Sequence, residues 1–165
     1  MRGQKSFDVF LISATGGQVV ARADYKVIAD YGFDNHPKLD VLIVVGGVHT
    51  DELNKPDVIE WVKAQAQQAS VVASVCTGAF ILAQAQVLAH HTVTTHWQDC
   101  ADLKQMFPHL NVVEGVRWVD EGDILTSGGI SAGIDMSLHM VEKFHSLALA
   151  EATAKQMEFS WTKNA

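Results

Sequence analysis

A cysteine stands where a buried strand is expected to meet a helix. The segment SVVASVCTGAFILAQA, residues 70–85, places Cys76 between an apolar run and a helical pattern, with Gly78 close behind it. At such a corner the strained backbone exposes the thiol, and the helix N-terminus favours its thiolate form. That arrangement predicts nucleophilic attack on an electrophilic carbon. The alternative is a buried structural cysteine, since Cys is one of the most buried residue types.

Two further groups could assist a thiol. Gly46 and Gly47 end the preceding buried strand, which is expected over residues 38–47. Their backbone N–H groups could face an oxyanion or a carbonyl. His96, in VTTHW, could orient or protonate a group near the thiol. Each also has a plain explanation: a strand-to-loop turn for the glycines, and a half-buried histidine bonded to backbone for His96.

Strand and helix patterns alternate along the chain, which indicates an α/β fold with a mainly parallel sheet. Pro56 opens a helix, TGGQ (15–18) reads as a turn, and VRWVDEGDILTSGG (116–129) reads as a β-hairpin with an Asp-Glu-Gly turn. The expected strands are 7–13, 38–47, 71–75 and 91–97, and the expected helices are 57–69, 77–88, 98–107 and two within 131–159, with a break near 145–147.

Length and composition point to a single domain over residues 1–165. The net charge is −7 without a block of Lys or Arg, which disfavours nucleic-acid binding, and no apolar run is long enough to span a membrane. Asp8 interrupts any signal-like segment in MRGQKSFDVFLIS, so we expect a cytoplasmic protein. Its cysteines, Cys76 and Cys100, are expected to be free thiols.

A metal site and a nucleotide site are both disfavoured. His96 and Cys100 are four residues apart, and His90 and His91 are near, but Trp97 intervenes and there is no second spaced pair of ligands. The glycine pairs form neither a dinucleotide fingerprint nor a phosphate-binding loop. We therefore expect no metal and no cofactor. The apolar stripe from Met136 to Phe144 is expected to be core or dimer interface.

Taken together, VVGG, SVCTGAF, VTTHW and TSGGISAGIDMSLHMVE resemble the ThiJ/PfpI superfamily, which is also described as class I glutamine-amidotransferase-like. The resemblance runs from Phe7 to Phe159. Within the superfamily it is strongest to isonitrile hydratase and to the sensing domain of AraC-type transcription regulators. The motifs are specific for the superfamily and much less specific for a substrate.

The resemblance implies a flavodoxin-like three-layer sandwich that forms a homodimer. It implies that Cys76 is the reactive thiol, that Thr77 follows it as in the hydratase branch, and that His96 lies near it. It further implies that Gly46 and Gly47, with the N–H of Thr77, bind an oxyanion.

The GGI-x-AGID segment of the superfamily is also present, and this chain matches it at Gly129, Ile130, Ala132, Gly133 and Asp135. Its glycines suit a tight turn at the start of a helix near the site. We therefore expect Gly129 and Ile130 among the substrate-binding residues, whereas Asp135 could be no more than a residue at a helix start.

The sequence departs from the superfamily at its start. The resemblance implies that members begin with another strand and helix, which carry an acidic residue that reaches the thiol, and we expect this sequence to lack that first strand–helix unit. Asp51 and Glu52 are the nearby candidates for a substitute acid. Two explanations fit: the sequence is a piece of a longer one, or the protein is a divergent and weakly active or inactive member.

Two functional hypotheses follow. The first is a cysteine-dependent hydratase or amidase-like hydrolase on a small electrophilic substrate, with isonitrile hydration as the specific version and Cys76, Thr77 and His96 as catalytic residues. The second is a non-catalytic domain that senses a small molecule or an oxidant through Cys76. A truncated pseudo-enzyme without a ligand is the third reading. The substrate does not follow from the sequence.

Overall fold

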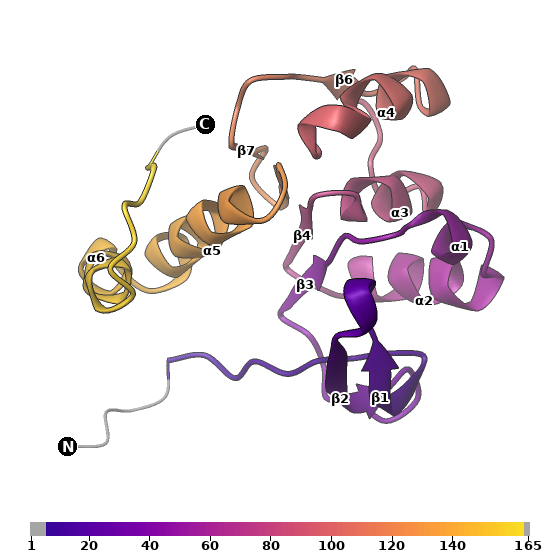
Figure 1. Ribbon diagram of the computed structural model, residues 1–165, viewed down its shortest axis with the longest axis horizontal. Coiled ribbons are helices and arrows are strands. Elements are labelled where there is room, and N and C mark those ends of the chain that lie inside the picture. Colours follow the sequence, from indigo (N-terminus) through magenta and orange to yellow (C-terminus); the bar gives the residue numbers. More distant parts are fainter. Residues whose placement is uncertain (1–5, 164–165) are drawn as a thin grey trace. The chain divides into compact units, whose positions relative to one another are not determined.

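A computed structural model describes residues 6–163 of this chain (Figure 1). Residues 1–5, the start of the segment MRGQKSFDVFLIS, and residues 164–165 lie outside the described residues. The chain forms two compact units, one ending at Lys38 and the other beginning at Leu39.

The first unit is built on an antiparallel hairpin. Its strands are β1 (Thr15–Val20) and β2 (Lys26–Gly32), joined through the 3-10 turn η1 (Arg22–Asp24). The prediction of a turn over residues 15–18 was wrong, because these residues begin β1. Gly16 and Gly17, with φ of 72° and 69°, lie where the register shifts, so the glycines form a bulge rather than a turn.

The apolar segment 7–13 is not a full strand. Only Ile12 pairs, in an isolated bridge with Tyr31, and the carbonyl of Leu11 accepts from the N–H groups of Asp30 and Tyr31. The prediction of a strand here was too long. Composition shows that a segment suits a strand, but how many of its residues pair with β2 depends on the tertiary approach, which composition does not give.

The second unit contains a four-stranded sheet in the order β3-β4-β8-β7. Its strands are β3 (Val41–Val44), β4 (Val71–Val75), β7 (Trp118–Asp120) and β8 (Ile124–Ser127). Pairing is parallel from β3 to β8 and antiparallel between β7 and β8. The predicted α/β class and the hairpin within 116–129 are therefore confirmed. A separate parallel pair joins β5 (Thr92–Val93) to β6 (Asn111–Val112), so the strand expected over 91–97 is much shorter.

Helices follow most of the predicted segments. Their bounds are α1 (Thr50–Leu53), α2 (Pro56–Ala66), α3 (Gly78–Gln84), α4 (Cys100–Met106), α5 (Ser131–Phe144) and α6 (Leu147–Gln156), with the 3-10 turn η2 (Trp97–Asp99) before α4. Pro56 starts α2 as expected. The predicted break before residue 147 is also present, and there the Ser146 hydroxyl accepts from the N–H of Leu149 and caps α6.

Helices cover both sides of the sheet in the second unit. Figure 1 shows α2 and α3 on one side of β3 and β4, and α5 and α6 on the other. Val71 and Ala73 of β4 pack in the core with Leu125 of β8 and with Met136 and Met140 of α5. This arrangement agrees with the predicted flavodoxin-like sandwich. Among the described residues, no helix is both long and apolar enough to cross a membrane.

Candidate functional site

Cys76 occupies a strained corner between β4 and α3. Its φ is 56°, in the left-handed region that residues with a Cβ rarely adopt, and its side chain is half-buried. The backbone N–H of Cys76 donates to the carbonyl of Ser127 at 3.0 Å, which ties the corner to the end of β8. Such strain persists where the surrounding structure enforces it, and it is concentrated at functional sites.

Glycines make this corner possible by letting the end of β3 approach it. A Cβ on Gly46 would lie 2.8 Å from the Cβ of Cys76 and 2.8 Å from the backbone N of Thr77. A Cβ on Gly78 would collide with the carbonyl group of Val44. The structure therefore brings Gly46, Cys76 and Thr77 together, as the meeting of neighbouring parallel strand ends at one edge of a sheet requires.

The Thr77 hydroxyl holds Gly47 by both of its backbone groups. Thr77 Oγ1 accepts from the N–H of Gly47 at 3.0 Å and donates to the carbonyl of Gly47 at 2.9 Å. The N–H of Gly47 is therefore engaged within the protein. Within residues 6–163, no hydrogen bond to a protein acceptor is found for the N–H of Gly46 or for that of Thr77, and the two groups lie close together at this corner.

His96 reaches the same region through its neighbour Thr95. Thr95 Oγ1 donates to the carbonyl of Cys76 at 2.7 Å. His96 itself follows β5 and precedes η2, and its Nδ1 lies 3.2 Å from a carboxylate oxygen of Asp99. That contact places the carboxylate of Asp99 beside Nδ1 of the His96 ring. Sequence reasoning missed the roles of Thr95 and Asp99, for which no local pattern gives a signal.

The predicted glycine-rich loop packs directly on His96. A Cβ on Gly129 would lie 2.5 Å from Cδ2 of the His96 ring, so only glycine allows this approach. Ile130 follows with a φ of 51° and a side chain that is 84% exposed. His96, Gly129 and Ile130 all line one cavity of about 480 Å³. Cys76 does not line this cavity, but two residues that do line it bond to its backbone. Thr95 Oγ1 donates to the carbonyl of Cys76, and the N–H of Cys76 donates to the carbonyl of Gly128 at 3.3 Å.

Asp51 and Glu52, the candidates for a substitute acid, make contacts of their own within the protein. Asp51 and Glu52 belong to the short helix α1, and the Glu52 carboxylate pairs with Lys55 at 2.6 Å. This hydrogen bond raises the pKa of Lys55. Among the described residues, neither carboxylate has a hydrogen bond or ion pair with Cys76.

Asp135 proves to be more than a residue at a helix start. Its fully buried carboxylate accepts from Arg117 Nε and, through the other oxygen, from the N–H of Thr162 at 2.7 Å. Arg117 also donates to Ser131 Oγ at 3.0 Å. Sequence reasoning did not identify Arg117, which lies in the β-hairpin region, because its partner is eighteen residues away.

Cys100 provides a contrast to Cys76. It is buried at the start of α4, and its thiol donates to the carbonyl of His96 at 3.5 Å. Burial raises the pKa of the Cys100 thiol, so its reactive thiolate form is disfavoured. Both cysteines are free thiols. In the part of the chain that the structure describes, no group of three metal-binding side chains is assembled.

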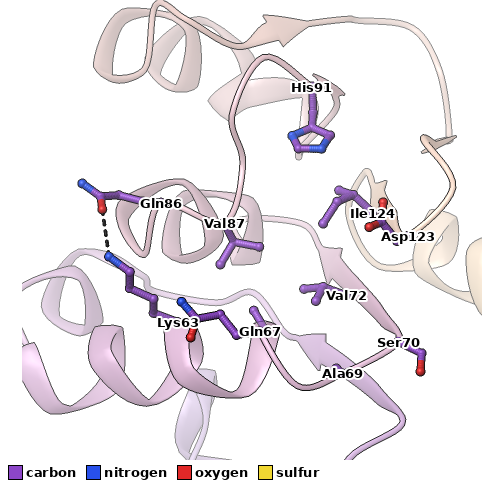
Figure 2. Close-up of a pocket in the computed structure, with 11 residues that line it drawn as sticks. Lys63, Gln67, Ala69, Ser70, Val72, Gln86, Val87, His91, Asp123 and Ile124 are labelled. Atoms are coloured by element: carbon purple, nitrogen blue, oxygen red, sulfur yellow. Dashed lines mark hydrogen bonds between the residues drawn. The ribbon is translucent and has the colours of Figure 1, made fainter.

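A second cavity lies at the other end of β4. This hollow has a volume of about 280 Å³, and Lys63 donates to Gln86 at 2.9 Å at its rim. Figure 2 shows the apolar side chains of Val72 and Ile124 among those that line it. It opens near the amino ends of the parallel strands, whereas Cys76 follows the carboxyl end of β4. The candidate site is therefore the region around Cys76, because ligands of open α/β sheets bind at carboxyl ends.

Comparison with known proteins decides the family. The model of the DJ-1/PfpI family matches residues 1–143. The chain belongs to the DJ-1/PfpI family. This family is the ThiJ/PfpI group that the sequence motifs resemble.

Relatives in this family have more than one kind of function. The chain is 29% identical over 164 residues to the HTH-type transcriptional regulator GbdR of Pseudomonas aeruginosa, a match that covers 99% of this chain and 44% of the regulator. It is 33% identical over 130 residues to an isonitrile hydratase of Pseudomonas putida, a match that covers 78% of this chain and 55% of the hydratase. The chain therefore spans about half the length of these curated relatives.

Solved structures of the DJ-1/PfpI family share the fold. A THiJ/PfpI family protein from Pseudomonas syringae superimposes with a TM-score of 0.83 at 23% identity, over 94% of this chain and 64% of that protein. At this level of identity the likeness concerns the fold alone.

Proposed function

We propose that this DJ-1/PfpI protein uses Cys76 as a nucleophile towards a small electrophilic carbon, and that hydration of an isonitrile is the reaction. The observation that carries the proposal is the backbone of Cys76, held at a φ of 56° with Gly46 packed against its Cβ. A purely structural cysteine would need no such strain. The 33% identity to an isonitrile hydratase supports the choice of substrate.

In the proposed reaction the thiol and then water add to the same carbon, and the thiol is then released. The Cys76 sulfur bonds to the isonitrile carbon, and the thiol proton ends on that carbon, which gives a thioimidate. Water then adds to the same carbon, the carbon–sulfur bond breaks, and the thiol takes back a proton. The product is the N-substituted formamide, so R–N≡C and water are consumed and the enzyme is unchanged.

The surrounding groups have separate parts in this proposal. The N–H groups of Gly46 and Thr77, for which no protein acceptor is found within residues 6–163, stabilise the charge that develops on the adduct. The Thr77 hydroxyl fixes Gly47 and so positions the loop. His96, oriented by Asp99, transfers protons through Nε2.

The test is formamide production from a neutral isonitrile such as cyclohexyl isocyanide, followed by NMR. We expect turnover with the wild-type protein, none with Cys76→Ala, and retained turnover with Cys100→Ala, the matched removal of the other thiol. Equal turnover by wild type and Cys76→Ala would refute the mechanism. No turnover by a folded wild-type protein would refute the hydratase function.

A sensing domain is the second candidate. The observation that favours it is the match to a transcriptional regulator along 99% of this chain. In that case Cys76 would respond to an oxidant, or the cavity beside His96 would bind an effector without turnover. A peroxide titration followed by intact mass measurement tests the first version: oxidation of Cys76 at low dose supports it, and an unmodified Cys76 counts against it. For either function we propose a cytoplasmic homodimer.

A further inference from the structure

The cavity of about 480 Å³ beside His96 is lined by two exposed apolar side chains, one of them on a strained backbone. Trp97 is 75% exposed and Ile130 is 84% exposed, and both line the cavity. Ile130 is β-branched, and a φ of 51° is a genuine outlier for such a residue. A strained and exposed isoleucine adds nothing to the stability of the protein. We therefore infer that Ile130 is placed there to contact a ligand.

Most polar groups of the lining are already occupied within the protein. Thr94 Oγ1 donates to the carbonyl of Val113 at 3.0 Å, and Thr95 Oγ1 donates to the carbonyl of Cys76. The Cys100 thiol donates to the carbonyl of His96. These side chains therefore shape the cavity but have no donor left for a ligand.

Arg117 is different, because its donors exceed its partners. An arginine has five N–H donors. Within residues 6–163 its side chain makes two hydrogen bonds, one from Nε to Asp135 and one from Nη2 to Ser131 Oγ. Its side chain is 38% exposed, and both Arg117 and Ser131 line the cavity. The buried Asp135 thus holds a rigid guanidinium with unused donors at the edge of the cavity.

We propose that this cavity binds a small monocarboxylate with an apolar body, and that its carboxylate pairs with Arg117 beside the Ser131 hydroxyl. The planar fork of arginine matches a carboxylate, and Trp97 and Ile130 contact the apolar body. Asp135 balances the single positive charge of Arg117, so the unused N–H donors rather than a net charge hold the ligand carboxylate, and a doubly charged phosphate suits the site less well. The inference rests on the proposed function only in placing the ligand next to His96.

Matched pairs of probes test the charge requirement. Benzoate and benzamide, and hexanoate and hexanamide, have the same bodies with and without the charge. We expect the carboxylates to raise the melting temperature and to bind measurably by calorimetry, and the amides to bind about tenfold more weakly or worse, since 1.4 kcal/mol corresponds to a factor of ten. Equal binding of the acid and its amide would overturn the proposal.

Two variants test whether Arg117 binds the carboxylate. Arg117→Lys keeps the charge but loses the fork, and we expect about a tenfold loss of benzoate affinity with little change for benzamide. Lys104→Gln removes a positive charge from α4 outside the cavity and is expected to bind benzoate as the wild type does. Unchanged benzoate binding by Arg117→Lys would contradict the proposal.

A second variant covers the case in which Arg117→Lys does not fold. Ser131→Ala leaves the ion pair with Asp135 intact and is expected to weaken benzoate binding several-fold and benzamide binding not at all. An unchanged benzoate affinity in that variant would count against the proposal. Isonitrile turnover by the wild type is measured separately. Turnover without carboxylate selectivity would reject this inference alone, and carboxylate binding without turnover would reject the hydratase function alone.

Discussion

At the scale of single residues, the site depends on how closely the backbones of two strand ends approach. Gly46 lies against the Cβ of Cys76 and against the backbone of Thr77. Backbone atoms cannot rotate away as a flexible side chain can, so a larger residue at position 46 must displace the corner that carries the thiol.

Gly46→Ala is therefore expected to lower both stability and thiol reactivity. The added Cβ should cost about 1–3 kcal/mol of unfolding free energy, as overpacking does, and slow the alkylation of Cys76 by iodoacetamide. Urea unfolding and mass spectrometry of the labelled thiols measure the two effects. Gly128→Ala is the control, since its Cβ would meet only ordinary contacts at 3.5 Å or more. Equal behaviour of the two variants would contradict the packing argument.

Thr77 offers a second test, because its hydroxyl makes two hydrogen bonds to one residue. Thr77→Ser keeps the hydroxyl and should retain most of the stability and of the Cys76 reactivity. Thr77→Val leaves the N–H and carbonyl of Gly47 without this partner and should cost about 1–3 kcal/mol. Amide hydrogen exchange at Gly47 should be faster in the valine variant only. Equal exchange in both variants would mean that the loop is held by other contacts.

At the scale of elements, a charged cluster fastens the β7–β8 hairpin to α5. Asp120 at the end of β7 accepts from His139 Nε2 at 2.7 Å and from Lys143 Nζ at 2.9 Å. His139 also stacks on Trp118 and has Glu142 3.6 Å from its Nδ1. Burial alone would raise the pKa of Asp120, but hydrogen bonds from His139 and Lys143 outweigh it and leave its pKa below the ordinary value.

This lowered pKa predicts a specific loss of stability in acid. A carboxyl whose pKa is depressed in the folded state stabilises the protein above its unfolded pKa, which for an aspartate is 3.8, and the contribution is lost as the pH falls through the folded value. The unfolding free energy of the wild type should therefore fall more steeply than that of Asp120→Asn below that pH. Parallel curves from chemical denaturation at successive pH values would refute the prediction.

The sequence was most informative where a local signal decides the structure. Pro56 marked the start of α2, and the Asp-Glu-Gly turn marked the hairpin. The edge of a parallel sheet also explains why Gly46 could be expected near Cys76. Partners that come from distant segments were not predictable: the pairing of segment 7–13, the Arg117–Asp135 ion pair and the bonds from Thr77 to Gly47 all depend on tertiary approach.

At the scale of the whole molecule, the two units differ greatly in what they bury. From Leu39 onward the chain contains the four-stranded sheet, its helices and the cluster around Ala73 and Leu125. Up to Lys38 it contains one hairpin, in which Ala29 is the buried apolar residue among those described. Segments below about 40 residues rarely fold without disulfides, metals or a partner.

The two units should therefore behave differently when they are separated. A peptide of residues 1–38 is expected to show the circular dichroism of an unfolded chain, and a fragment of residues 39–165 to keep helical ellipticity and unfold cooperatively. The intact chain is the reference. Strand-like ellipticity in the short peptide, or a non-cooperative transition in the long fragment, would contradict this expectation.

The left-handed backbone of Cys76 also bears on how the protein could change over generations. A Cβ in that conformation costs about 1–2 kcal/mol that glycine would not incur. A single base change converts a cysteine codon to a glycine codon, so a more relaxed version of this corner is always one mutation away. We expect Cys76→Gly to unfold at a higher temperature than Cys76→Ala. Without selection for the chemistry of the thiol, the more stable glycine would therefore be expected to replace Cys76.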